Sequence, residues 1–499
     1  MTSNACKKGT FKEETGSVCM ESNKLDMGSR DLISCLPQEV LGDILSLLPT
    51  KLAASTSLLS KTWRYLFALV HSLDFDDTVL LQPPPEEGRD KLKESFRNFV
   101  DRTLALQCGC GSRIKKFSLT YLVTNNSDVV DERRWITSVV ERGVLEVDVT
   151  LRPRWLGPVH TDEVHGDCFL PYHLFRSKTL VKLCLGTDTI VGKLSPDVSL
   201  PALKSLFLYT IMFDDQDLSD VLLPGCPMLE ELTVVHKTDF YPNYRISSQS
   251  IKKLTVFYCY DFGIDDGSRI SFDAPSVVSL KYTDYALSEY QLVNLGSLGK
   301  AKLDISYSKK SIKRPDISGL LVGISNVETL HLSPDSTDVS LLCVFFYLLD
   351  KTQDFLERIC VCVFQLISRC VKHGLVLPVF NNLVTLSFGS RNKRGWKLLP
   401  YLVKQSPKLE TLIIQGLDSY TGDVTIGLFQ VKELHVVGYK GTAKELQHLK
   451  SLLAGTECIP KMQVEFPEDV VVDDAKMIQT RRDLFILVGV VSTDVAYFE

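Results

Sequence analysis

The 499-residue sequence has no long apolar run of the kind that crosses a membrane. Its longest runs, Val339–Leu349 and Leu484–Val491, are well short of the roughly 20 residues that span a bilayer. Residues 1–30 also lack the apolar core of a secretory signal. We therefore expect no membrane partner and a place in the cytoplasm, the nucleus or both.

A strong charge of one sign is also missing. The formal net charge is −5, and neither end of the chain carries an acidic or basic tail. Proteins that bind nucleic acids through phosphate groups present clustered lysine and arginine side chains. We therefore expect no nucleic-acid partner, while the apolar content of 44% is ordinary for a globular protein.

The fourteen cysteines lack the paired spacing of a zinc site. One residue separates Cys108 from Cys110, and one separates Cys360 from Cys362, but no second pair completes either set. Reduced thiols that pack in the core of a cytosolic or nuclear protein are the favoured interpretation.

The closest approach to a metal site is one short loop that contains His160, His165 and Cys168, with Asp162 and Glu163 between them. The sequence offers no fourth fixed ligand for a tetrahedral site, and the Cys168 thiol would have to ionise before it could bind a metal. A polar surface turn is therefore the favoured interpretation, and we predict neither a metal nor a cofactor.

Catalytic motifs are also missing, because the sequence has no G-x-S-x-G elbow, Walker loop or H-E-x-x-H helix. The chain is therefore predicted not to be an enzyme. Two basic loops could hold an acidic or phosphorylated segment through charge-assisted hydrogen bonds, although solvated loops are the favoured interpretation. These loops contain Lys309, Lys310, Lys313 and Arg314, and Arg391, Lys393 and Arg394.

The stretch from Leu36 to Trp63 is predicted to fold into three short helices. Pro49 ends the first helix because it lacks an amide proton and its ring clashes with the preceding turn. Thr50 is predicted to cap the second helix and Ser60 the third. Apolar side chains recur at the helical period of 3.6 residues in the first helix and form one broad stripe: Leu36, Val40, Leu41, Ile44, Leu45 and Leu48.

A unit of fewer than roughly 60 residues cannot bury so much apolar surface by itself. An exposed apolar stripe commonly marks a binding site for another protein. The alternative is an ordinary helix that faces the core of its own domain.

The segments LPQEVLGDILSLLPTK, TSLLSKTWRYLF and SLDFDD follow one another between Asp31 and Asp77. This run resembles the F-box of plant proteins of the F-box/FBD/leucine-rich-repeat family. The resemblance implies that the run binds the Skp-type adaptor of a cullin-based ubiquitin ligase. Two positions depart from the family pattern, because Leu52 replaces an acidic residue and Thr62 replaces an arginine. Carried over by position, the adaptor contacts would be Leu36, Pro37, Val40, Ile44, Leu45, Leu48, Leu52, Leu58 and Trp63.

From Leu180 onward the sequence repeats a template of the form Leu-x-x-Leu-x-Leu. Apart from the long gap before Leu386, successive copies lie about 22 to 27 residues apart, which is the spacing of leucine-rich repeats. A single unit cannot bury its own apolar face, so neighbouring units must stack into a solenoid. The middle position of the template is assigned to Leu183, Leu206, Leu232, Leu254, Leu280, Leu303, Leu330, Leu386, Leu412 and Leu434.

The remaining segments complete the predicted organisation. Helical spacing predicts helices over residues 91–106 and 132–142, and a helical insertion over 338–374. The run from Val431 to Phe466 resembles the FBD module, which implies a strand, a helix over 443–453 and a last strand that together cap the open end of the solenoid.

The predicted fold is therefore α/β, with an N-terminal three-helix F-box, an irregular leucine-rich-repeat solenoid and a C-terminal FBD-like α/β cap. The predicted boundaries are a disordered leader over 1–29, the F-box over 30–75, a linker over 76–90, the solenoid over 91–430, and the cap with its tail over 431–499.

Three functional hypotheses follow. The first is a substrate-recognition subunit of an SCF-type cullin E3 ubiquitin ligase, whose F-box docks on the Skp-type adaptor and whose repeats capture a protein substrate. The second is a repeat scaffold for protein–protein interaction that no longer recruits a ligase, for which Leu52 and Thr62 are the only hints. The third, an enzyme with a site in the repeats, has no motif in its favour.

Overall fold

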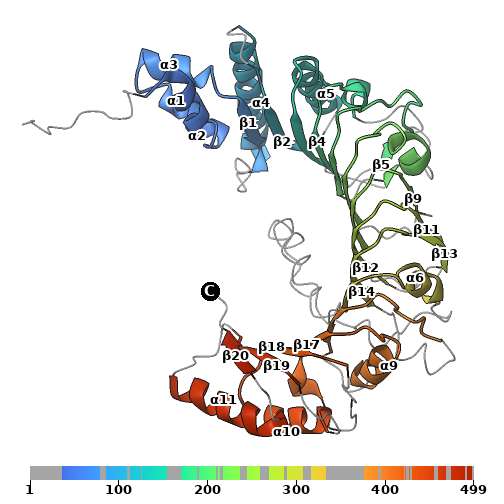
Figure 1. The fold of residues 1–499 in the computed structure, drawn as a ribbon. Coiled ribbons are helices and arrows are strands. Elements are labelled where there is room, and N and C mark those ends of the chain that lie inside the picture. The colour runs from blue at the N-terminus through green and yellow to red at the C-terminus, as the bar shows by residue number, and fades with distance from the viewer. Residues whose placement is uncertain are drawn as a thin grey trace, which may run out of the picture.

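A computed structural model describes the fold shown in Figure 1. The described residues are 36–78, 86–109, 113–124, 126–153, 170–187, 190–209, 212–213, 217–236, 244–258, 269–285, 289–306, 316–332, 376–390, 395–420, 422, 426, 430–454, 459–467, 474–488 and 492–496. Within these ranges, no helix is long and apolar enough to cross a membrane, and no three metal-binding side chains gather into a site.

One parallel sheet runs through the whole described chain. It contains fifteen strands in the order β1-β2-β3-β4-β6-β8-β10-β12-β14-β15-β16-β17-β18-β19-β20. The strands are β1 Ser72–Asp76, β2 Lys116–Val123, β3 Glu146–Pro153, β4 Lys182–Thr187, β6 Ser205–Tyr209, β8 Glu231–His236, β10 Lys253–Tyr258, β12 Ser279–Tyr285, β14 Lys300–Ser306, β15 Thr329–Leu332, β16 Thr385–Gly389, β17 Thr411–Gln415, β18 Glu433–Val437, β19 Lys461–Glu465 and β20 Ser492–Ala496.

The sheet lines the inner side of an open arc, and most helices and short strands lie on its outer side (Figure 1). Two small outer sheets, β13-β11-β9 and β5-β7, accompany the middle repeats. The outer strands are β5 Ile190–Gly192, β7 Met212–Phe213, β9 Tyr244–Ser247, β11 Arg269–Asp273 and β13 Glu289–Asn294. The α-helices are α1 Gln38–Leu45, α2 Thr50–Thr56, α3 Lys61–Phe67, α4 Glu86–Gly109, α5 Asn126–Glu141, α6 Ser318–Gly323, α9 Leu399–Lys404, α10 Ala443–Leu452 and α11 Asp474–Val488.

Short helical turns fill the remaining outer positions. They are η2 Tyr172–Arg176, η3 Leu218–Leu222, η5 Gly395–Leu398 and η6 Leu417–Ser419. The alternation of inner strand and outer segment is the α/β solenoid that the repeat spacing predicts, so the predicted fold class is confirmed.

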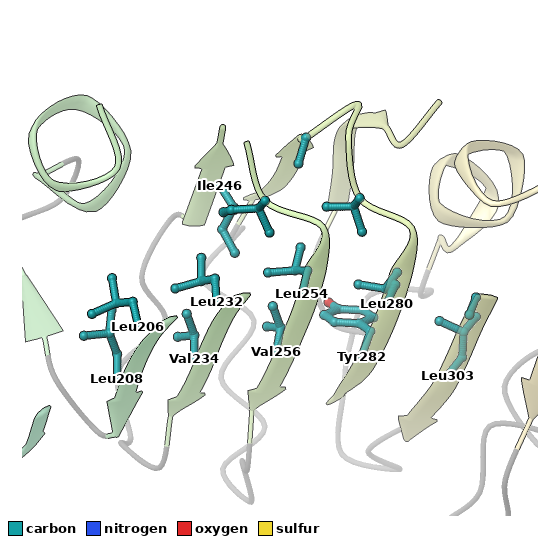
Figure 2. Close-up of a cluster of buried hydrophobic side chains, with 14 of the residues drawn as sticks. Leu206, Leu208, Leu232, Val234, Ile246, Leu254, Val256, Leu280, Tyr282 and Leu303 are labelled. Carbon is teal, nitrogen blue, oxygen red and sulfur yellow. The ribbon is translucent and has the colours of Figure 1, made fainter. Parts of the chain in front are cut away.

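The apolar positions of the template stack from one strand to the next. Leu206 on β6 pairs with Leu232 on β8, and Leu254 on β10 pairs with both Leu232 and Leu280. Because side chains alternate between the two faces of a strand, the template positions all point to the outer side, where they form one ladder (Figure 2). This ladder and the outer elements build a single hydrophobic core that extends from the first helices to the last repeat.

One template position was wrongly assigned from the sequence. Leu280 pairs with Ala301, and Tyr282 pairs with Leu303, so Ala301 holds the middle position on β14. The copy therefore begins at Leu298, and Leu303 occupies its third apolar position. A shift of two residues keeps every side chain on the same face of the sheet, so the pattern of alternation could not reveal the error.

The template also extends beyond the ten copies found in the sequence. Phe117 on β2 pairs with Leu73 on β1 and with Val147 on β3, and all three side chains are buried. At the other end, Met462 on β19 pairs with Leu434. The ladder therefore begins in β1, directly after the first three helices. In these early strands the template carries Val, Phe or Ile in place of leucine, which hid it from a search for leucines.

The predicted helices at 91–106, 132–142 and 443–453 are present as α4, α5 and α10. In α10, Thr442 accepts a hydrogen bond from the Glu445 amide while the Glu445 carboxylate accepts one from the Thr442 amide, which is a complete capping box. The predicted insertion at 338–374, the His160–Cys168 loop and both basic loops lie outside the described residues.

The inner face of α5 carries an isolated carboxyl group. Glu132 is completely buried, and neither of its carboxyl oxygens has a hydrogen-bond partner among the described residues. Burial in an apolar environment disfavours the charged form and raises the Glu132 pKa to about 8. This carboxyl group is therefore protonated in the folded protein at mildly acidic pH.

We predict that Glu132 makes the fold less stable as the pH rises. An acid whose folded-state pKa is raised contributes its full stability below its unfolded pKa near 4.5, and loses it as the pH climbs toward 8. The unfolding free energy of Glu132→Gln minus that of the natural protein should therefore increase by roughly 2–4 kcal/mol when the pH is raised from 5 to 8. Urea unfolding at both values measures this gain.

The matched control is Glu141→Gln, at the exposed end of the same helix. Its stability should follow that of the natural protein at both pH values. Parallel pH profiles for Glu132→Gln and the natural protein would show that the Glu132 carboxyl group does not titrate with folding.

Candidate protein-docking surface

Helix α1 has two apolar faces. Leu41, Gly42 and Leu45 point inward, while Leu36, just before the helix, and Val40 and Ile44 point outward and are exposed. A helix that is apolar on two sides needs two partners, and the described part of the chain provides only one of them.

Leu45 was expected among the adaptor contacts, but it is only 1% exposed and belongs to the core. The prediction that Leu45 contacts the adaptor is therefore wrong. The reason is geometric: one residue along the helix turns the side chain by about 100°, so Ile44 and Leu45 lie on different faces. The sequence shows one wide stripe, and only packing against α3 divides it.

The exposed apolar side chains extend beyond α1 into the next turns. Leu48, Leu52 and Leu58 are exposed as expected, whereas Trp63 is partly buried and packs against the core. Leu47, at 85% exposed, and Leu59 were not expected, because neither belongs to the helical stripe or to a matched family position. We call this set the outer surface: Leu36, Pro37, Val40, Ile44, Leu47, Leu48, Leu52, Leu58 and Leu59.

The helix ends follow the sequence only in part. The Ser60 side chain accepts a hydrogen bond from the Trp63 amide at 3.3 Å and so caps α3 as expected. Pro49, rather than Thr50, precedes α2, and Thr50 is already a buried helical residue. Its hydroxyl group accepts a hydrogen bond from the Asp74 amide on β1 at 2.6 Å. Thr50 therefore joins α2 to the sheet.

Further polar contacts fix the three helices to the solenoid. The Ser46 hydroxyl group donates to the Gly42 carbonyl at 2.8 Å and accepts from the His71 amide at 3.0 Å. The buried Gln107 side chain, on α4, donates to the Phe67 carbonyl at the end of α3. The helices thus close the N-terminal edge of the sheet and hold the outer surface in a fixed direction.

Gly42 allows the closest approach in this unit. A Cβ atom at Gly42 would lie 3.3 Å from the Leu69 Cβ atom, which is tighter than ordinary packing. The backbone of α1 therefore rests directly on the segment that leads into β1. This contact leaves the inner side of α1 no room for a partner, so only its outer surface can bind one.

Comparisons with known proteins match both parts of this arrangement. The F-box domain model matches residues 33–74, and the model described as "FBD-associated F-box protein At5g56370, LRR repeats" matches residues 133–292. F-box/LRR-repeat protein At3g60040 of Arabidopsis thaliana is 47% identical over 476 residues, or 93% of this chain and 95% of that protein. F-box/LRR-repeat protein At1g06630 of the same plant is 45% identical over 456 residues, or 90% of this chain and 100% of that protein.

We predict that Thr50→Val destabilises the whole protein by about 1–2 kcal/mol, because the Asp74 amide would lose its acceptor in this partly buried hydrogen bond. Thermal unfolding followed by circular dichroism measures the change. Thr56→Val is the control, since the Thr56 hydroxyl group bonds only within its own helix, to Ala53. Equal melting temperatures for Thr50→Val and Thr56→Val would mean that the Thr50 bond does not hold the helices to the sheet.

Proposed function

The chain belongs to the family of plant F-box/LRR-repeat proteins, and from this premise we propose that it is the substrate-recognition subunit of an SCF-type cullin ubiquitin ligase. Its F-box binds the Skp-type adaptor, and through the adaptor the cullin. Its repeats capture a protein substrate. The observation that carries this proposal is the outer surface, which gathers nine exposed apolar side chains within residues 36–59.

The adaptor contacts are Leu36, Pro37, Val40, Ile44, Leu48, Leu52 and Leu58, with Trp63 supporting them from the partly buried side. Large apolar side chains that enter a groove commonly dominate the energy of an interface. Leu36 and Pro37 begin the surface just before α1, and Ile44 lies in the last turn of that helix.

The contribution to catalysis is proximity. A tethered substrate meets the charged ubiquitin-conjugating enzyme at a high effective concentration, so no catalytic residue of this chain is required. The described cysteines Cys108, Cys184 and Cys226 are free thiols, which fits work in a reducing compartment such as the cytoplasm or nucleus.

A repeat scaffold without ligase activity is the alternative. The two proposals differ in one measurement, which is ubiquitin transfer by a reconstituted cullin complex that contains this chain. Ubiquitin conjugated to the chain itself supports the ligase proposal, while adaptor binding without any conjugation supports the scaffold.

Point variants suit these tests better than deletion of the F-box. Removing residues 36–71 would remove Thr50, the hydrogen-bond acceptor of the Asp74 amide, and the His71 carbonyl, which accepts from the Lys115 amide, and would expose the edge of β1. A solenoid without its cap exposes apolar surface and loses stability. Loss of a partner after deletion would therefore not report on the outer surface.

We predict that the double variant Leu36→Ala with Pro37→Ala weakens adaptor binding by about 2–4 kcal/mol, a loss of roughly thirty- to a thousand-fold. Isothermal titration calorimetry with a purified Skp-type adaptor measures this loss. Val130→Ala, exposed on α5 away from the F-box, should keep the natural affinity. An unchanged affinity in the double variant would remove the outer surface from the adaptor interface.

A further inference from the structure

A second hydrophobic cluster lies on the inner face of the sheet, apart from the main core. Val235 on β8 and Phe257 on β10 form its centre, and Phe207 and Tyr209 on β6 pack against them. Val235 and Phe257 are only 4% and 7% exposed, while Phe207 and Tyr209 are partly exposed. The inner face is the concave face of the arc, and most of it carries small or polar residues. The large apolar side chains of this cluster therefore differ from their surroundings.

The strand register places these side chains next to one another. Tyr209 pairs with Val235, and Val235 pairs with Phe257, so three neighbouring strands contribute to one row. Phe207 lies in the adjacent row, opposite Thr233. At the strand spacing of a sheet the cluster is about 10 Å wide, which suits one or two side chains of a partner. It is too small for the roughly 800 Å² that a folded partner commonly buries.

Positive charge lies along one side of the cluster. Lys281 on β12 pairs with Thr255 on β10, and its side chain is exposed on the inner face. Among the described residues, Lys281 makes no ion pair. Lys302 pairs with Lys281 from β14, and Asp304, one row further, is largely buried.

On the opposite side of the cluster, the two β4 residues that pair directly with it are uncharged. Cys184 pairs with Phe207, and Gly186 pairs with Tyr209. The Cys184 thiol stays neutral, because burial together with the neighbouring Asp148 carboxylate raises its pKa. The cluster thus has an apolar centre, a neutral side toward β4 and a cationic side toward β12.

We propose that this inner-face cluster is the substrate-docking site, and that it takes an extended protein segment with an aromatic or large aliphatic side chain and an acidic residue a few positions away from it. The apolar side chain packs on Phe207 and Tyr209 at the edge of the cluster, and the acidic side chain pairs with Lys281. The proposal rests on the proposed function, since it names the class of substrate that the repeats capture.

Selection of peptides on the full-length chain in complex with its Skp-type adaptor tests this assignment. The probe is a displayed library of random twelve-residue peptides. Enriched peptides should place Asp or Glu within a few residues of Phe, Trp, Tyr or Leu. Phe207→Ser with Tyr209→Ser should weaken the selected peptides about tenfold or more, because an apolar anchor of this size contributes roughly 1.5–3 kcal/mol.

The decisive variant is Lys281→Glu, which should turn the preference from acidic to basic residues at the same distance from the apolar anchor. A misfolded protein could lose binding but could not reverse this preference. Lys404→Glu, exposed on the outer helix α9, is the matched control and should keep the acidic preference.

An acidic preference that survives Lys281→Glu, binding that survives the double serine variant, or a library without enriched peptides would each overturn the proposal. Adaptor binding is measured in parallel on every variant. A result against the inner-face cluster with intact adaptor binding leaves the ligase proposal standing, so the two failures are distinguishable.

Discussion

Lateral stacking of apolar side chains is the constraint on which this structure depends. Each inner strand presents its template side chains to one face only, and no single repeat has enough residues to cover them. Leu206, Leu232, Leu254 and Leu280 are buried because their neighbours in the next strand cover them. The fifteen strands therefore form one ladder, and both ends of the ladder need a cover.

The F-box is the cover at the N-terminal end. Its inner face continues the core through Leu41, Leu45 and Phe67, and its Thr50 hydroxyl group accepts a hydrogen bond from the edge strand. Its outer face has no such partner within the described chain. The same small unit thus stabilises the solenoid on one side and offers a binding surface on the other, and its attachment directs that surface relative to the concave face.

Stacking also has a consequence for the concave face of the sheet. Side chains at every other strand position are turned away from the core, so they can change without loss of the ladder. Here Phe207, Tyr209, Val235 and Phe257 gather on three strands, next to Lys281. The proposed adaptor contacts and the proposed substrate contacts thus lie on two surfaces that share no residues.

The fold class could be predicted from the sequence, because the helical stripe, the ordered F-box segments and the recurring template are all local patterns. The helices α4, α5 and α10 and the Ser60 cap were likewise predicted from residues close to one another in the chain. Exposed positions such as Ile44 and Leu48 were also found in this way, since the spacing of a helix places them on one side.

Contacts between distant segments show which side of the stripe is covered, which copy of the template contains Ala301, and where the ladder begins. Leu45 is buried in the core, Ala301 is identified by its pairing with Leu280, and β1 joins the sheet through β2. The inner-face cluster was invisible for the same reason. Its side chains come from strands separated by more than twenty residues, and only the register of the sheet brings them into contact.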